Sequence, residues 1–178
     1  MSVAGPSEFL ARRRVSLGFV FALAVLYFSQ PTRVSLAAGV ALGMAGEAIR
    51  VWAAGHLEKS REVTTSGPYR LTRHPLYLGS SIMGLGVCVA SRSIVVSVLM
   101  IVYMGATIAA AIRTEEAFLR RQFGGAYDDY AASRGPLAAR QFKLARAWRN
   151  KEYRAVSGFA LFVLLMIGRM WLARAGVI

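Results

Sequence analysis

Fourteen consecutive residues, from Ser66 to Gly79, hold an unusual share of the side chains in this chain that could do chemistry. The stretch reads SGPYRLTRHPLYLG and places two arginines, two tyrosines and one of the two histidines between apolar segments. A polar cluster between membrane-length apolar runs is costly, so this stretch either binds a charged ligand or is an ordinary helix start with interfacial arginine and tyrosine anchors. The pair His74-Pro75 predicts the start of a helix, whose free N–H groups suit a carboxylate or a phosphate.

A second polar group, Arg113-Thr114-Glu115-Glu116, lies at the end of a later apolar segment. Glu116 and Arg120 are four residues apart, in the order that favours an ion pair on a helix. Glu115 has no such partner four residues on. A ligand ammonium or sulfonium group would therefore be a natural counter-ion for Glu115.

A third polar group, Glu47 and Arg50, interrupts an apolar segment at a spacing of three residues, which places both on one helix face. Charges at membrane depth are costly and usually face the interior of the bundle. The two side chains could simply neutralise each other, or they could form one wall of a polar cavity. The sequence leaves both alternatives open.

The composition places these groups in a membrane protein. The 178 residues are 56% hydrophobic, and their mean hydropathy is +0.45. Lysine and arginine outnumber aspartate and glutamate by 22 to 9, which gives a formal charge of +13. With so many apolar runs, this excess favours cytoplasmic loops or anionic membrane lipid as its explanation, and we expect no nucleic-acid partner.

Five apolar segments predict an all-α, polytopic bundle of about five transmembrane helices. Several are shorter than the roughly 20 residues that cross a bilayer squarely, so four full spans are also possible. No long repeat or low-complexity linker divides the chain, and we expect a single domain over residues 1–178. The segments are 15–29, 34–54, 76–90, 94–112 and 156–173.

The basic residues predict the orientation. They concentrate at the N-terminus and in residues 55–75 and 113–155, whereas the opposite ends of the segments carry few positive charges. The positive-inside rule then places the N-terminus and the polar clusters on the cytoplasmic side of the inner membrane.

Residues 137–155 also suggest an amphipathic helix on the membrane surface. Leu137, Leu144, Trp148 and Ala155 recur at helical spacing, with basic residues on the other side. The basic face would either bind anionic lipids or only fix the orientation.

The sequence lacks the motifs of several common classes of enzyme and binding site. Two histidines and one cysteine, without HxxxH or CxxC spacing, argue against a metal site. The chain has no GxxxxGK[ST] phosphate loop, no GxGxxG after a predicted strand and no GxSxG elbow. A non-metal membrane site for a zwitterionic or anionic ligand remains.

Three blocks of sequence resemble the isoprenylcysteine carboxyl methyltransferase family and its phospholipid methyltransferase relatives. They are AIRVWAAGH at 48–56, TSGPY…RHPLYLG at 65–79 and EEAFL…FG…YDDY at 115–130. The resemblance implies a small integral membrane enzyme that uses S-adenosylmethionine, with its cofactor-binding core at about residues 48–130. The positions it assigns to the cofactor are His56, Val63, Thr64, Tyr69, His74, Pro75, Leu76, Tyr77, Glu115 and Glu116.

One position departs from the family pattern. Ala111 stands where the resemblance places a substrate-binding arginine, one turn before the acid. Arg113 or Arg50 would then position the lipophilic acceptor. The resemblance favours O-methylation of a carboxylate, with N-methylation of a phospholipid amine as the alternative. A non-catalytic membrane scaffold or lipid-binding protein is a further possibility.

Overall fold

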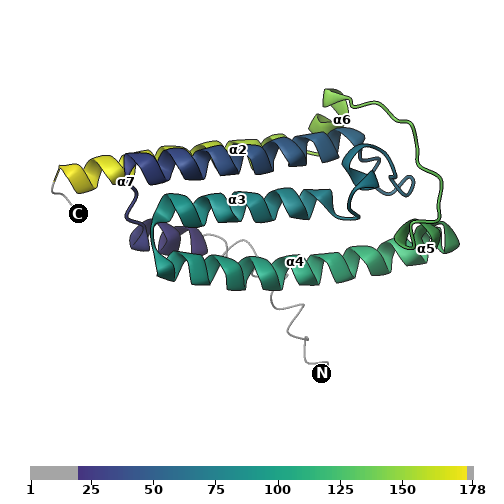
Figure 1. Ribbon diagram of the computed structural model, residues 1–178, viewed down its shortest axis with the longest axis horizontal. Helices are drawn as coiled ribbons and strands as arrows, with labels where there is room; N and C mark the ends of the chain where they lie inside the picture. Colours follow the sequence, from purple (N-terminus) through teal and green to yellow (C-terminus); the bar gives the residue numbers. More distant parts are fainter. Residues whose placement is uncertain (1–19, 176–178) are drawn as a thin grey trace, which may run out of the picture.

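The computed structural model describes residues 20–175, which form helices and contain no strand. Four long helices run side by side, and short elements join them at one end (Figure 1). Residues 20–28 are the described part of an earlier helix. The prediction of an all-α bundle is confirmed. The elements are α2 (Arg33–His56), η1 (Gly67–Arg70), α3 (Pro75–Ser91), α4 (Ile94–Phe123), α5 (Gly125–Ala131), α6 (Leu144–Arg149) and α7 (Tyr153–Arg174).

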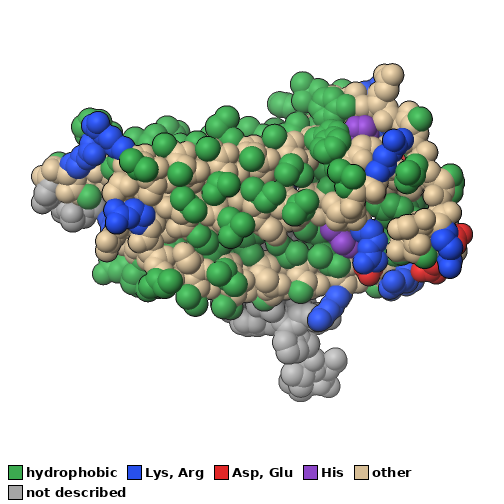
Figure 2. Space-filling view, in the orientation of Figure 1, with side chains coloured by type: hydrophobic (Ala, Val, Ile, Leu, Met, Phe, Trp, Pro, Cys, Tyr) green, Lys and Arg blue, Asp and Glu red, His purple; other side chains and the backbone are tan. Residues whose placement is uncertain are grey.

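Three of the long helices, α2, α4 and α7, are long and apolar enough to cross a membrane, and α3 is a shorter apolar helix of 17 residues. The first predicted segment, 15–29, lies partly outside the described residues. Hydrophobic side chains cover the middle of the bundle, while acidic, basic and histidine side chains gather where α5 and α6 lie (Figure 2). We call this the charged end.

Proline and glycine set the helix boundaries near the charged end, and the sequence predicts the one at Pro75. Helix α3 begins at the buried Pro75, directly after His74. Gly67 opens η1 at a φ of +57°, a conformation that glycine adopts without strain. Gly124 ends α4 at a φ of +50°, and α5 starts at the next residue. Because α4 continues past the apolar segment to Phe123, the predicted acid pair lies inside a helix.

Glycines let α2 and α3 pack backbone against backbone. A Cβ atom added to Gly46 would lie 2.5 Å from the carbonyl oxygen of Gly79, and one added to Gly79 would lie 2.6 Å from that of Gly46. Gly86 meets the carbonyl oxygen of Gly39 in the same way, at 2.6 Å. Small residues at such an interface allow close approach of membrane helices.

Residues 135–143 depart from the predicted surface helix, which is wrong for this part of the chain. They are not helical, and regular helix resumes only in the short α6 and in α7. Their backbone bonds to distant groups instead. The hydroxyl of Thr65 donates to the carbonyl of Pro136 at 3.2 Å and accepts from the N–H of Ala138 at 2.9 Å.

The basic side chains of the same region turn toward the protein. Arg146 is buried and donates to Glu58 at 2.7 Å, while Arg149 reaches the same carboxylate at 3.2 Å. Arg140 pairs with Glu62 in the loop after α2. These ion pairs hold the 57–66 loop against α6 and the segment before it, so part of the predicted basic face serves as an internal clamp, while its other basic side chains are exposed. The hydrogen bond from Arg146 lowers the pKa of Glu58, outweighing the opposing effect of burial.

The α2–α3 contact predicts a difference between two glycines. Replacing Gly46 by alanine should lower the free energy of unfolding by about 1–3 kcal/mol, because the added methyl group has no room. Gly105→Ala is the matched control, since a Cβ atom at Gly105 meets nothing within 4 Å. Thermal unfolding in detergent micelles measures both, and equal behaviour of the two variants would contradict the close contact.

The clamp predicts a pH-dependent loss of stability in Glu58→Gln. Because the pKa of Glu58 is lower in the folded chain, its stabilisation is full above the unfolded pKa and disappears as pH falls through the folded value. The variant should be less stable by about 1–3 kcal/mol at neutral pH. Its difference in melting temperature from the wild type should shrink below about pH 4. Asp129→Asn, which breaks an exposed pair with Arg134, should change little at either pH.

Candidate functional site

Tyr69 lies at the centre of the candidate site. The turn of η1 buries its side chain, and the hydroxyl of Tyr130 donates to its carbonyl oxygen at 2.8 Å. Burial and then the negative charge of Glu115 raise the pKa of Tyr69 far above its ordinary value, with smaller contributions from Tyr130, Glu152 and Tyr77. The hydroxyl of Tyr69 therefore stays protonated at neutral pH.

Four side chains join the start of α3 to α4. Glu116 accepts from His74 Nε2 at 3.1 Å and pairs with Arg73 at 3.2 Å and with Arg120 at 3.8 Å. We call this group the carboxylate cluster. The Glu116–Arg120 pair that the spacing indicated is present, but the two residues before α3 lie closer to the carboxylate. The Nδ1 atom of His74 is buried and has no hydrogen-bond partner among the described residues.

Glu115 differs from its neighbour. It is half-buried and forms no ion pair within the described part of the chain. Burial is the main cause of the raised pKa of both Tyr69 and Tyr130, and the charge of Glu115 adds to it. In Tyr130 the pKa rises to about 12. A half-buried carboxylate without an ion-pair partner is suited to a cationic ligand.

Arg50 pairs with Glu47, which is the first of the two alternatives that the sequence left open. It pairs with Glu152 at 2.7 Å and with Glu47 at 3.9 Å, so its charge is neutralised. It also donates to the hydroxyl of Ser80 and, at 3.5 Å, to the carbonyl of Leu76 on α3. The guanidinium group thereby ties α2, α3 and the start of α7 together.

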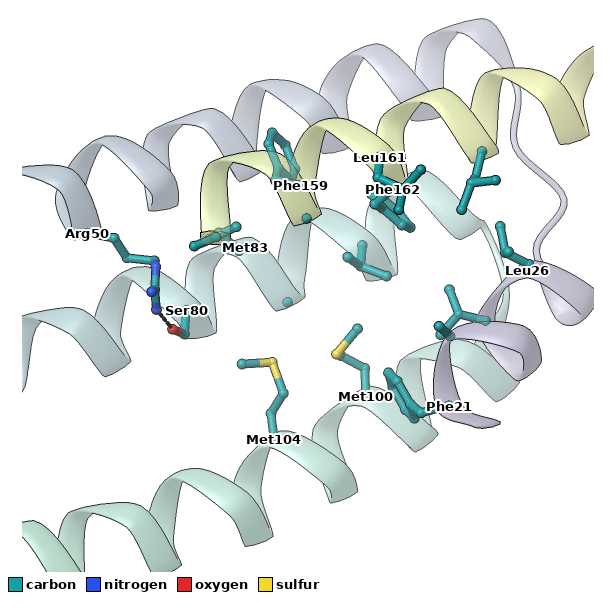
Figure 3. A pocket seen from close by; sticks show the side chains of 17 residues that line it. Phe21, Leu26, Arg50, Ser80, Met83, Met100, Met104, Phe159, Leu161 and Phe162 are labelled. Carbon is teal, nitrogen blue, oxygen red and sulfur yellow. Dashed lines mark hydrogen bonds between the residues drawn. The ribbon is translucent and has the colours of Figure 1, made fainter. Parts of the chain in front are cut away.

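A largely apolar cavity of about 480 Å³ begins at Arg50 and Ser80 (Figure 3). These are the two polar side chains among its lining residues, and they lie together at one end of the view. Three methionines and three phenylalanines account for much of the remaining wall. They are Met83, Met100, Met104, Phe21, Phe159 and Phe162. This apolar groove has the shape and chemistry to accept a hydrocarbon chain.

One face of α4 leads from the apolar groove toward Tyr69. Met104, Ile108, Ala111 and Glu115 follow at steps of four, three and four, and all are half-buried. Ala111 lies between the groove and the acid, so this face carries no positive charge. Arg113, predicted to bind the acceptor, is exposed and forms no ion pair with any described residue. The structure does not bring Arg113 into the site.

The loop residues predicted to touch the cofactor are held in a separate network. His56 is buried, with Nδ1 3.1 Å from the hydroxyl of Ser66. Thr64 is buried and accepts from the N–H of Glu58 at 3.2 Å, and Val63 is half-buried. No hydrogen bond links these residues to the carboxylate cluster in the described structure. They shape the loop that precedes Tyr69.

Sequence reasoning missed Glu152, which binds Arg50 and contributes to the environment of Tyr69. One signal was available, because Glu152 is the only acid in the basic stretch 134–154 and directly precedes an apolar segment. Among residues 20–175, no three His, Cys, Asp or Glu side chains lie close enough to hold a metal ion.

Known proteins resemble this chain over the region that contains the candidate site. The phospholipid methyltransferase family matches residues 17–126, which is more than half of the chain. The nickel-cobalt-cadmium resistance protein NccN of Alcaligenes xylosoxydans xylosoxydans is 33% identical over 146 residues, covering 73% of this chain and 68% of the relative. The cobalt-zinc-cadmium resistance protein CzcN of Cupriavidus metallidurans is 34% identical over 131 residues, covering 65% and 59%.

A plant protein matches a shorter region. The probable protein-S-isoprenylcysteine O-methyltransferase of Oryza sativa subsp. japonica is 36% identical over 76 residues, which cover 43% of this chain and 40% of the relative. No solved structure matches. The region matched by the family contains α2 to α4, Tyr69 and the carboxylate cluster. The chain therefore belongs to the phospholipid methyltransferase family.

Proposed function

We propose that this chain is an integral membrane enzyme that transfers a methyl group from S-adenosylmethionine to a lipophilic acceptor. The observation that carries the proposal is the single face of α4 that joins the apolar groove to Glu115. One part of this path suits a hydrocarbon chain and the other suits a cation. Family membership supports the same type of reaction.

The residues around Tyr69 fit the proposed cofactor. S-adenosylmethionine carries a sulfonium and an ammonium group, and Glu115 is a carboxylate that no described side chain neutralises. Tyr69 offers a protonated hydroxyl, and the buried Nδ1 of His74 lacks a partner. Pro75, Leu76 and Tyr77 complete this wall in the proposal, and His56, Val63 and Thr64 would contribute from the preceding loop.

The cofactor, when bound, supplies an already activated methyl group. The chain then needs to align the acceptor and exclude water. In the proposal, the walls of the apolar groove hold the acceptor tail and its polar group lies near Ala111. Glu115 and Tyr69 orient the cofactor from the other side.

Two acceptor chemistries fit this framework. The resemblance to isoprenylcysteine methyltransferases favours a carboxylate, which needs a positive partner in a buried site. Arg50 is already paired with Glu152 and Glu47, and Arg113 is exposed. This arrangement supports the second candidate, the amine of a phospholipid, which needs no free cation. An ammonium acceptor would first release its proton to water at the charged end.

The proposed orientation places the charged end in the cytoplasm and the bundle in the inner membrane. The surplus of lysine and arginine at this end supports it through the positive-inside rule. The cofactor would then reach Tyr69 directly from the aqueous side.

Cofactor binding tests the proposal against a non-catalytic scaffold. Calorimetry on the purified full chain should detect S-adenosylmethionine and its demethylated product, S-adenosylhomocysteine. Glu115→Gln should weaken binding of S-adenosylmethionine about tenfold or more, since a charged contact is lost. Asp128→Asn removes an exposed acid from α5 and should bind normally. A wild-type chain that binds neither compound would refute the methyltransferase proposal.

The acceptor is identified by the chemistry of the labelled product. The full chain is incubated with methyl-labelled cofactor and membrane extract, and the lipid fraction is treated with base. We expect base-stable label on an amine headgroup, because the described site offers no free cation for a carboxylate. Base-labile label would instead identify an ester, and the carboxylate candidate would replace the amine.

A further inference from the structure

A second cavity, of about 440 Å³, lies between the last turn of α2 and η1. It shares no lining residue with the apolar groove or with the carboxylate cluster. Its volume is typical of a small-molecule site. The residues that line it are Trp52, His56, Gly67, Arg70, Leu71 and Arg140.

The charges of this cavity do not balance. Arg140 pairs with Glu62 and donates to the carbonyl of His56 at 3.3 Å. Arg70 donates to the carbonyl of Ala138 at 2.7 Å and has no carboxylate partner among the described residues. Two guanidinium groups thus share one carboxylate, which leaves one surplus positive charge. An anion is the complementary ligand.

The floor of the cavity is kept open by glycine. Gly67 has a φ of +57°, and a Cβ atom there would lie 2.5 Å from Cδ2 of His56. The imidazole ring in turn packs edge-on against Trp52, with ring centroids 6.4 Å apart. A larger residue at Gly67 would therefore close the space beside the two arginines.

Exposed apolar side chains indicate where the cavity lies relative to the membrane. Trp52 is 40% exposed and Leu71 is 81% exposed, although both are large and hydrophobic. Trp52 lies in the last turns of α2, a helix long and apolar enough to span. Tryptophan at the end of a span usually lies at headgroup level, and Arg70 and Arg140 line the same cavity.

We propose that this cavity binds the phosphate of an anionic phospholipid. The phosphate lies between Arg70 and Arg140, and the acyl chains pass over Trp52 and Leu71. The cavity shares His56 with the residues proposed to contribute to the cofactor site, but its surplus positive charge suits an anion better than the sulfonium and ammonium groups of S-adenosylmethionine. The exposed apolar residues favour a lipid over free phosphate as the source of the anion. The proposal does not depend on methyl transfer.

Ligand-dependent thermal stability tests the site on the purified full chain in detergent micelles. Added phosphatidylglycerol should raise the melting temperature, whereas zwitterionic phosphatidylcholine and inorganic phosphate should not. Arg70→Gln should increase the phosphatidylglycerol concentration for the half-maximal shift about fivefold, and Arg70→Lys should largely restore it. Arg61→Gln is the matched control, since it removes the same charge from an exposed loop position outside the cavity.

The outcomes distinguish specific lipid binding in the cavity from non-specific electrostatic attraction. Equal losses in Arg70→Gln and Arg61→Gln would overturn the proposal, as would an unchanged response in Arg70→Gln. A full shift with inorganic phosphate alone would identify a soluble anion and overturn the lipid assignment. An equal shift with phosphatidylcholine would show that the charge plays no part. Trp52→Ala should weaken the response to phosphatidylglycerol if the acyl chains cross this ring.

Discussion

The backbones of α2 and α3 approach each other where both helices carry glycine, and the position of Arg50 against α3 depends on this contact. The approach brings Arg50 within hydrogen-bonding distance of the carbonyl of Leu76 and of Ser80, which opens the apolar groove. His56, at the end of α2, packs separately against Gly67 of η1, and Tyr69 in the same turn is buried. A methyl group at Gly46 would disturb the α2–α3 interface directly.

Much of the framework follows from local sequence. Apolar runs gave the long helices to within a few residues, apart from the longer extent of α4, because burial and backbone hydrogen bonding act over the same stretch. Proline after His74 marked the start of α3 correctly. The Glu47–Arg50 pair also follows from spacing, since residues three apart share a helix face.

The features that the sequence did not predict share a physical cause, which is contact between residues far apart in the chain. The apolar spacing of 137–155 suggested one amphipathic helix, but Thr65 binds the backbone of Pro136 and Ala138. Periodicity cannot reveal that acids in the 57–66 loop pair with Arg140 and Arg146 of the predicted basic face. In the same way, the partner of Arg50 at the start of α7 and the bond between His74 and Glu116 depend on how helices meet.

The length of α4 sets the geometry of the proposed reaction. Thirty residues make a rod of about 45 Å, whereas the hydrocarbon layer is only about 30 Å thick. Glu115 lies roughly 16 Å beyond Met104 along this rod. Such a helix is long enough to place its groove-lining turns in the hydrocarbon layer and its acidic turns near the aqueous surface. In the proposed reaction, the polar cofactor can therefore bind from the aqueous side while the tail of the lipophilic acceptor stays in the membrane.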